Sequence, residues 1–194
     1  MRKPHLLGDN RNNGFEVLQF AIDQSESDLR PILLYILLAE NTPGVELKIE
    51  NINQKLIKFK QNHSPDKYYF VIMGYLEYFN HNYNSALFYF ENTLQFLELF
   101  DDLLMFIVKD KIGEIFLHKK EFSKATKTFS NLIFDIESSF SKLNYSIIKQ
   151  DKLYAIFDVF LAKIALKYIY SQVLNENYFF ALKNAFVLLD NPIF

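Results

Sequence analysis

The chain has 194 residues, of which 50% are hydrophobic and 17% are aromatic, so it contains ample material for a packed core. This composition excludes an intrinsically disordered chain, because such chains lack the apolar surface that offsets the entropy lost on ordering. Basic and acidic residues number 21 and 23, and this near balance gives no electrostatic reason to expect a nucleic acid partner.

The first third of the chain is expected to be a polar tail followed by helices. Residues 1–13 are mostly polar and predict a flexible tail. Beyond them, apolar residues recur every three or four positions, which is typical of amphipathic helices. The expected helices cover residues 15–23, 28–40 and 46–61. We therefore expect residues 14–66 to form an N-terminal helical region, in which residues 28–62 are a candidate degenerate helical pair.

The rest of the chain, residues 67–194, shows the same helical period more strongly and divides into pairs of helices joined by short turns. The expected pairs are 67–79 with 85–100, 103–118 with 122–140, and 148–174 with 178–190. No segment alternates apolar and polar residues for long enough to predict a strand. The sequence therefore predicts an all-α fold.

Two of these pairs contain the same pattern of small and aromatic residues. Residues 70–90 align without a gap on residues 109–129, and the matched positions are Gly74 with Gly113, Tyr83 with Phe122, Ala86 with Ala125, and Phe90 with Phe129. Glycine in the first helix and alanine in the second are small enough to let two antiparallel helices approach closely. The first aromatic residue is expected to fill the turn, and the second to fill the groove towards the next pair.

This pattern resembles the tetratricopeptide repeat (TPR), whose signature is an aromatic residue, Leu-Gly, a Tyr, then Ala and a further aromatic residue. Two good copies cover about residues 67–100 and 106–140. A degenerate third covers about residues 162–194, where Ala181 is kept but Ile169 and Ala185 replace the glycine and the second aromatic residue. The copies are offset by 39 (113 − 74) and 56 (169 − 113) residues, against 34 in the family pattern.

The resemblance implies antiparallel helical hairpins stacked as a short, right-handed, TPR-like solenoid over residues 67–194; the alternative is a helical bundle without repeats. It also implies a concave surface lined by the first helix of each pair. That surface is expected to contain Tyr68, Val71, Tyr75, Tyr78, Phe79, Asp110, Glu114, His118 and Tyr170, with Ile107, Leu117, Lys163, Leu166, Val173 and Leu174 beside them.

The expected concave surface is aromatic with a small acidic patch, which suits an extended or helical peptide held by apolar anchors. Family members that bind the carboxy-terminal tails of chaperones use Lys, Arg and Asn at positions that here hold Val71, Tyr75 and Glu114. Because these three residues cannot hold a carboxylate in that way, we do not expect such tails to bind.

Catalytic and metal-binding motifs are not found in the sequence. Cysteine is absent, which excludes disulfides and thiolate chemistry. The four histidines lack metal-ligand spacing, and there is neither a glycine-rich phosphate loop nor a nucleophile elbow. We therefore expect no enzyme activity, no metal site and no cofactor.

Membrane insertion is not expected either. No stretch approaches the roughly 20 apolar residues that cross a bilayer, and residues 1–14 lack the apolar segment of a signal peptide. We expect a cytoplasmic protein.

These observations favour a non-enzymatic adaptor that binds a protein or peptide partner through an aromatic concave face. Two alternatives also bind polypeptides: a bacterial secretion chaperone and the ligand domain of a peptide-pheromone receptor. A third is a structural subunit whose aromatic surface is buried permanently in an oligomer. The aromatic C-terminal segment, residues 178–194, is the candidate surface for a homo-oligomer, because monomers rarely expose large apolar patches.

Overall fold

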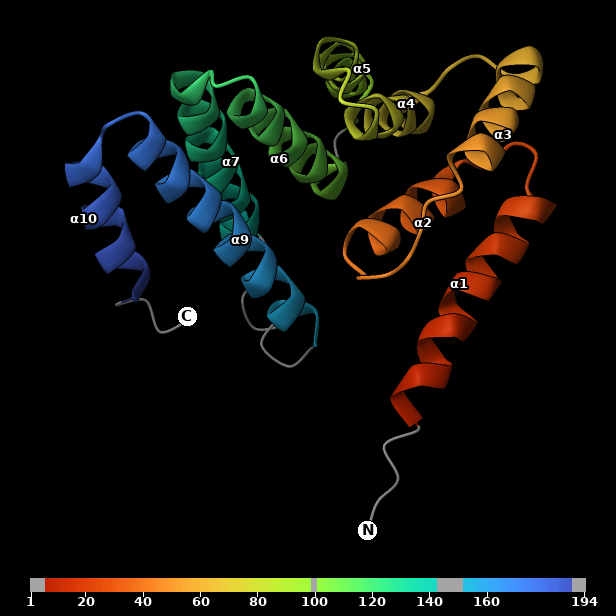
Figure 1. The fold of residues 1–194 in the computed structure, drawn as a ribbon, viewed down its shortest axis with the longest axis horizontal. Helices are drawn as coiled ribbons and strands as arrows, with labels where there is room; N and C mark the ends of the chain where they lie inside the picture. Colours follow the sequence, from red (N-terminus) through yellow and green to blue (C-terminus); the bar gives the residue numbers. More distant parts are fainter. Residues whose placement is uncertain (1–5, 99–100, 143–151, 190–194) are drawn as a thin grey trace. The chain divides into compact units, whose positions relative to one another are not determined.

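The computed structural model describes residues 6–98, 101–142 and 152–189, and within these ranges it contains helices and turns but no strand (Figure 1). The predicted all-α fold is therefore confirmed. The chain divides into two compact units, residues 1–96 and 97–194, which are described separately.

The N-terminal unit consists of α1 (Leu6–Gln24), α2 (Arg30–Glu40), α3 (Ile49–Asn62), α4 (Lys67–Phe79) and α5 (Tyr83–Gln95). In this unit α1 packs on α2, α2 packs on α4, and α4 packs on α5. The expectation of a tail up to residue 13 is wrong for residues 6–13, because α1 begins at Leu6. Gly8 and Gly14 weaken a helix by only about 1 kcal/mol each, and no proline follows until Pro31.

The C-terminal unit consists of α6 (Asp102–His118), α7 (Phe122–Lys142), α9 (Lys152–Leu174) and α10 (Tyr178–Leu189). Here α6 packs on α7, α7 on α9, and α9 on α10, so each described helix packs on the next described one. We call α4 with α5 hairpin 1, α6 with α7 hairpin 2, and α9 with α10 hairpin 3.

The three hairpins share one turn. Its central residue has a positive φ of 60° or 61° and is His81, Lys120 or Glu176. The next residue donates its backbone N–H to the carbonyl five residues earlier, over 2.8–2.9 Å, in the pairs Asn82 to Glu77, Glu121 to Phe116, and Asn177 to Gln172. This left-handed closure satisfies carbonyls at the end of the first helix. The common turn places residue n of hairpin 1 in the position of n + 39 in hairpin 2 and n + 95 in hairpin 3 (81, 120 and 176).

Hairpins 1 and 2 are closed by the same glycine–phenylalanine contact. A Cβ atom added to Gly74 would lie 2.6 Å from Cε1 of Phe90, and one added to Gly113 would lie 2.5 Å from Cε1 of Phe129. Both rings are fully buried. Each ring therefore occupies the space that any larger residue at the glycine would need.

Alanine at the start of the second helix is also buried in all three hairpins, at Ala86, Ala125 and Ala181. In hairpin 3 the positions of the glycine and the phenylalanine hold Ile169 and Ala185, so the large residue has moved from the second helix to the first. The exchange keeps one large and one small residue in the pair, which preserves the volume to be packed.

Candidate functional site

The expected concave surface differs from hairpin to hairpin, and in hairpin 1 much of it is closed. Val71 and Tyr75 are fully buried, so the expectation that they line an open surface is wrong. The Tyr75 ring packs edge-on against Phe90, with the ring centroids 5.5 Å apart. The other expected residues of this hairpin, Tyr68, Tyr78 and Phe79, are half-buried.

The cause of this burial is that α4 has neighbours on several sides. It packs against α2 and α5, and the Tyr69 ring stacks on Phe59 of α3 with the centroids 6.3 Å apart. A signal for this was present in the sequence, since the helix is apolar nearly all round, which is typical of a helix enclosed by others.

In hairpin 2 the corresponding positions hold acidic residues, which form ion pairs with a lysine of hairpin 3. Asp110 and Glu114, both on α6, correspond through the common turn to Val71 and Tyr75. Lys167 of α9 reaches across from hairpin 3, and its Nζ lies 2.7 Å from both carboxylate oxygens of Asp110. The same Nζ lies 2.7 Å from Oε1 of Glu114. The two acidic residues therefore hold the first helix of the next hairpin.

Lys111 completes this ionic cluster, because its Nζ lies 2.7 Å from Oε2 of Glu114. Burial disfavours the charged form of Glu114, but the ammonium groups of Lys111 and Lys167 outweigh it and lower the pKa of this carboxyl from 4.5 to about 2. Burial is the largest influence on Asp110 and raises its pKa, although Lys167 acts in the opposite direction. The cluster is part of the packing between α6 and α9, and only His118, at the end of α6, is an exposed member of the expected surface in this hairpin.

Around this cluster, the contact between hairpins 2 and 3 is apolar. A buried core joins the three helices and consists of Phe106 from α6, Ala125, Phe129, Leu132 and Ile136 from α7, and Ile164 from α9. One polar pair crosses from α7 to α9, where Oγ1 of Thr126 lies 3.0 Å from Oγ of Ser171. Both α6 and α7 thus take part in holding α9.

In hairpin 3 the expected surface is exposed at Lys163 and at three apolar residues. Leu166, Tyr170 and Val173 of α9 are 64%, 56% and 39% exposed. Their spacing of four and three residues places them on one face of the helix. Leu166 and Tyr170 occupy the positions that hold Asp110 and Glu114 in hairpin 2.

The last helix, which packs on α9, also exposes large apolar side chains. Six large apolar side chains of α10 are 54–75% exposed, and they are Tyr178, Phe179, Phe180, Leu182, Phe186 and Val187. Only Ala181 is buried among the described side chains of this helix. We call the exposed residues Leu166, Tyr170 and Val173 of α9 together with these six the terminal apolar face.

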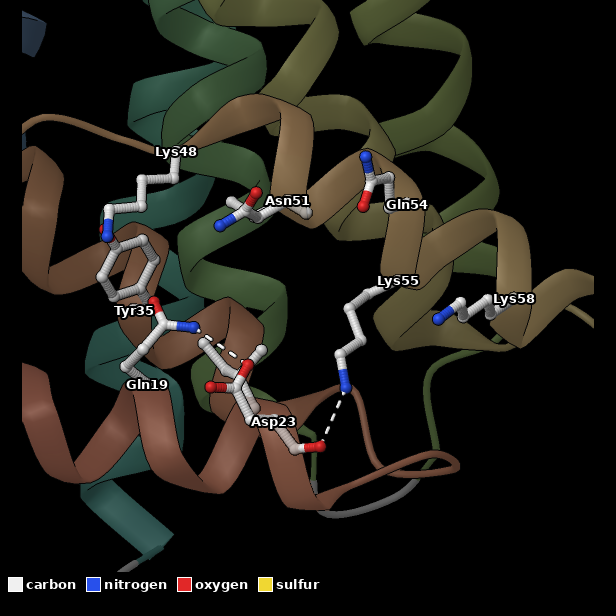
Figure 2. A pocket seen from close by; sticks show the side chains of 10 residues that line it. Gln19, Asp23, Tyr35, Lys48, Asn51, Gln54, Lys55 and Lys58 are labelled. Atoms are coloured by element: carbon white, nitrogen blue, oxygen red, sulfur yellow. Dashed lines mark hydrogen bonds between the residues drawn. The ribbon is translucent and has the colours of Figure 1, made fainter.

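A pocket of about 140 Å³ lies in the N-terminal unit between α1, α2 and α3. Figure 2 shows Lys48, Lys55 and Lys58 around it, with the Lys55 ammonium donating to the backbone carbonyl of Asp23 over 3.1 Å. Its remaining lining is Gln19, Ile22, Tyr35, Asn51, Ile52 and Gln54. Small-molecule sites are usually larger, roughly 300–1,000 Å³, so this small pocket is a weaker candidate than the terminal apolar face.

Among the described residues, no three His, Asp or Glu side chains come together in a way that could hold a metal ion. None of the helices in the described ranges combines the length and the apolar character needed to cross a membrane.

Comparison of the chain with family models, with curated proteins and with solved structures finds no match.

Proposed function

We propose that this protein is a non-enzymatic, TPR-like adaptor of the cytoplasm that binds a protein or peptide partner through the terminal apolar face. The proposal moves the binding surface from the concave face of all three hairpins to hairpin 3. Of the residues expected in the first helix of each pair, those of α9 are the ones that combine exposure with a continuous apolar stripe.

The observation that carries the proposal is the concentration of large apolar side chains on two neighbouring helices. Nine of them, three from α9 and six from α10, are exposed. Monomeric proteins rarely leave a contiguous apolar patch of more than a few hundred Å² open to water, and larger patches mark interaction sites. Aromatic residues of this kind also supply most of the binding energy at protein interfaces.

The same observation favours a second candidate, a structural subunit that buries this face permanently against another copy. The two candidates differ in the state of the isolated chain. An adaptor is monomeric without its partner, whereas an obligate subunit is an oligomer at every practical concentration.

The test is affinity capture with the full chain and a matched pair of variants. Leu182 of the terminal apolar face and Phe88 of α5 are both 59% exposed. Leu182→Glu is expected to lower recovery of a specific partner at least five-fold, because a carboxylate at an apolar interface loses its hydration. Phe88→Glu is expected to leave recovery unchanged. Partner recovery that is the same for wild type and both variants, with folding intact by circular dichroism, would contradict the proposal.

A further inference from the structure

Hairpin 2 shows how a hairpin of this chain holds a following helix. Lys167 and Ser171 of α9 are received by Asp110 and Glu114 on α6 and by Thr126 on α7. These contacts lie within one compact unit of the structure. They define a receiving face made of both helices of the hairpin.

In hairpin 3 the corresponding face is exposed. Adding the offset of 56 residues (176 − 120) to Asp110, Glu114 and Thr126 gives Leu166, Tyr170 and Leu182. All three are exposed. The register is reliable at these positions because α6 and α9 run without a break into the common turn, and α7 and α10 begin directly after it.

We infer that hairpin 3 binds one amphipathic α-helix of a partner protein in the place that α9 takes on hairpin 2, and that this helix carries an apolar residue where α9 carries Lys167. The inference rests on the proposed function, since it names the kind of partner that the terminal apolar face accepts. It is carried by continuity with the interface between hairpins 2 and 3.

The side chains at the receiving positions explain why the partner helix is expected to carry an apolar residue in the place of Lys167. In hairpin 2 the Lys167 ammonium loses much of its hydration and is compensated by two carboxylates. In hairpin 3 those positions hold Leu166 and Tyr170, which offer no negative charge. An ammonium buried there would be desolvated without a partner, which is costly, whereas an apolar side chain would bury the Leu166 and Tyr170 surfaces at a gain.

The residues at the position equivalent to Lys167 make a second copy of this chain an unsuitable partner. The residue equivalent to Lys167 is Lys111 in α6 and Ile72 in α4. Lys111 is charged and Ile72 is fully buried within its own unit. None of the three first helices therefore offers an accessible apolar residue at the required place.

The experiment uses two labelled peptides with the sequence of residues 160–174, each with a short lysine tail for solubility, one native and one with Lys167→Leu. Binding to the full chain is measured by fluorescence anisotropy. The Lys167→Leu peptide is expected to bind wild type at least ten-fold more tightly than the native peptide. The chain's own α9 is not displaced, because it is tethered at a high effective concentration.

A double variant of the full chain, Leu166→Asp with Tyr170→Glu, installs the carboxylates of hairpin 2 on hairpin 3. It is expected to reverse the preference, so that the native peptide binds more tightly. Circular dichroism checks that this variant, whose changed side chains are exposed in the wild type, keeps its helical content. Reversal supports the inference, because a merely sticky surface would lose affinity for both peptides.

Three outcomes would overturn the inference: no binding of either peptide, equal binding of both, or a preference that the double variant leaves unchanged. A wild-type dimer in sedimentation that becomes a monomer with Leu182→Glu would also overturn it, since the occupant would then be a second copy. Failure of the adaptor proposal is separate, because partner capture that depends on Leu182 can survive any of the peptide results.

Discussion

Hairpins 2 and 3 have the same turn but carry different chemistry on corresponding faces. In both, the turn is closed by a residue with a positive φ and by a backbone hydrogen bond from the next residue to the carbonyl five residues before it. On the receiving face of hairpin 2, Asp110 and Glu114 form ion pairs with Lys167. The corresponding residues of hairpin 3, Leu166 and Tyr170, are exposed. The backbone framework therefore does not fix what a hairpin binds.

The interior of the two hairpins differs as well. Hairpin 2 has a small residue, Gly113, on its first helix facing a large one, Phe129, on the second. Hairpin 3 has Ile169 and Ala185 at these positions. The two hairpins share the turn and its register, while the larger residue of the pair stands on the second helix in hairpin 2 and on the first helix in hairpin 3.

Substitutions at Phe129 and Gly113 test whether these two residues share one space, and they should have the largest effect on stability. Phe129→Ala should lower the free energy of unfolding by about 3–5 kcal/mol, because it leaves a cavity where a fully buried ring was. Gly113→Ile should lower it by about 3 kcal/mol, because the new Cβ would lie 2.5 Å from that ring. The double variant copies hairpin 3 and should recover at least half of the summed loss in urea denaturation.

The same double exchange in hairpin 1, Gly74→Ile with Phe90→Ala, is the control and should show coupling of the same sign. Losses that simply add in both hairpins would mean that the two positions do not share one space. The relation between the hairpins would then be a similarity of turns alone.

The second effect concerns the ionic cluster that hairpin 3 lacks. Glu114→Gln should lower the free energy of unfolding at pH 7 by about 2–3 kcal/mol, because it removes the carboxylate that pairs with both Lys111 and Lys167 and leaves Asp110 to pair with Lys167. Glu114 binds its proton less readily in the folded state, with a pKa of about 2 against 4.5. Its contribution is therefore complete above pH 4.5 and is lost as the pH falls towards 2.

Urea denaturation at pH 7, 4 and 3 checks this, and the difference between wild type and Glu114→Gln should shrink at each step. Asp110→Asn is the matched comparison. Burial raises the pKa of Asp110, so ionising it costs stability, and its replacement should be the milder of the two at pH 7. A Glu114→Gln effect that is constant over this pH range would exclude the cluster as an electrostatic contributor.

The helices and the hairpins could be predicted from the sequence because they depend on patterns of neighbouring residues. Helical period, the Gly–Phe and Ala positions and the polar turns act over about 20 residues, and α4 was predicted with its bounds, Lys67–Phe79. The sequence did not predict the burial of Val71 and Tyr75, because α4 packs against α2 as well as α5, and the contact with α2 joins residues far apart in the sequence. It also missed the bond between Lys167 and Asp110, which joins residues 57 positions apart and has no local pattern.

The open surface was anticipated in part. The aromatic residues of the segment 178–194 are visible in the sequence as a candidate interaction surface, because monomers rarely expose large apolar patches. The equivalence of Leu166 and Tyr170 with Asp110 and Glu114 could also be derived from the repeat register. Only the three-dimensional structure shows that Asp110 and Glu114 pair with Lys167 while Leu166 and Tyr170 are exposed.

The third effect compares the buried alanines. Ala125→Leu and Ala181→Leu should each lower the free energy of unfolding by about 1–3 kcal/mol, because Ala125 is fully buried and Ala181 nearly so. Leu182→Ala, on the exposed side of the same helix, is the control and should change it by less than about 0.5 kcal/mol. If Ala181→Leu is as mild as the control, α10 does not pack on α9 in the way α7 packs on α6.

The smallest effect concerns the shared turn. Lys120 has a φ of 61°, a conformation that costs a residue with a Cβ atom about 1 kcal/mol. Lys120→Gly should therefore raise the free energy of unfolding by about 0.5–1 kcal/mol. Lys119→Gly is the control, because Lys119 has a φ of −77°, where glycine adds freedom to the unfolded chain; the substitution also removes the ion pair of Lys119 with Glu121, and both effects should destabilise. The same substitution at Glu176 should match the gain at Lys120 in urea denaturation, since both residues close the same turn; a gain in one hairpin only would show that the two turns are held by different contacts.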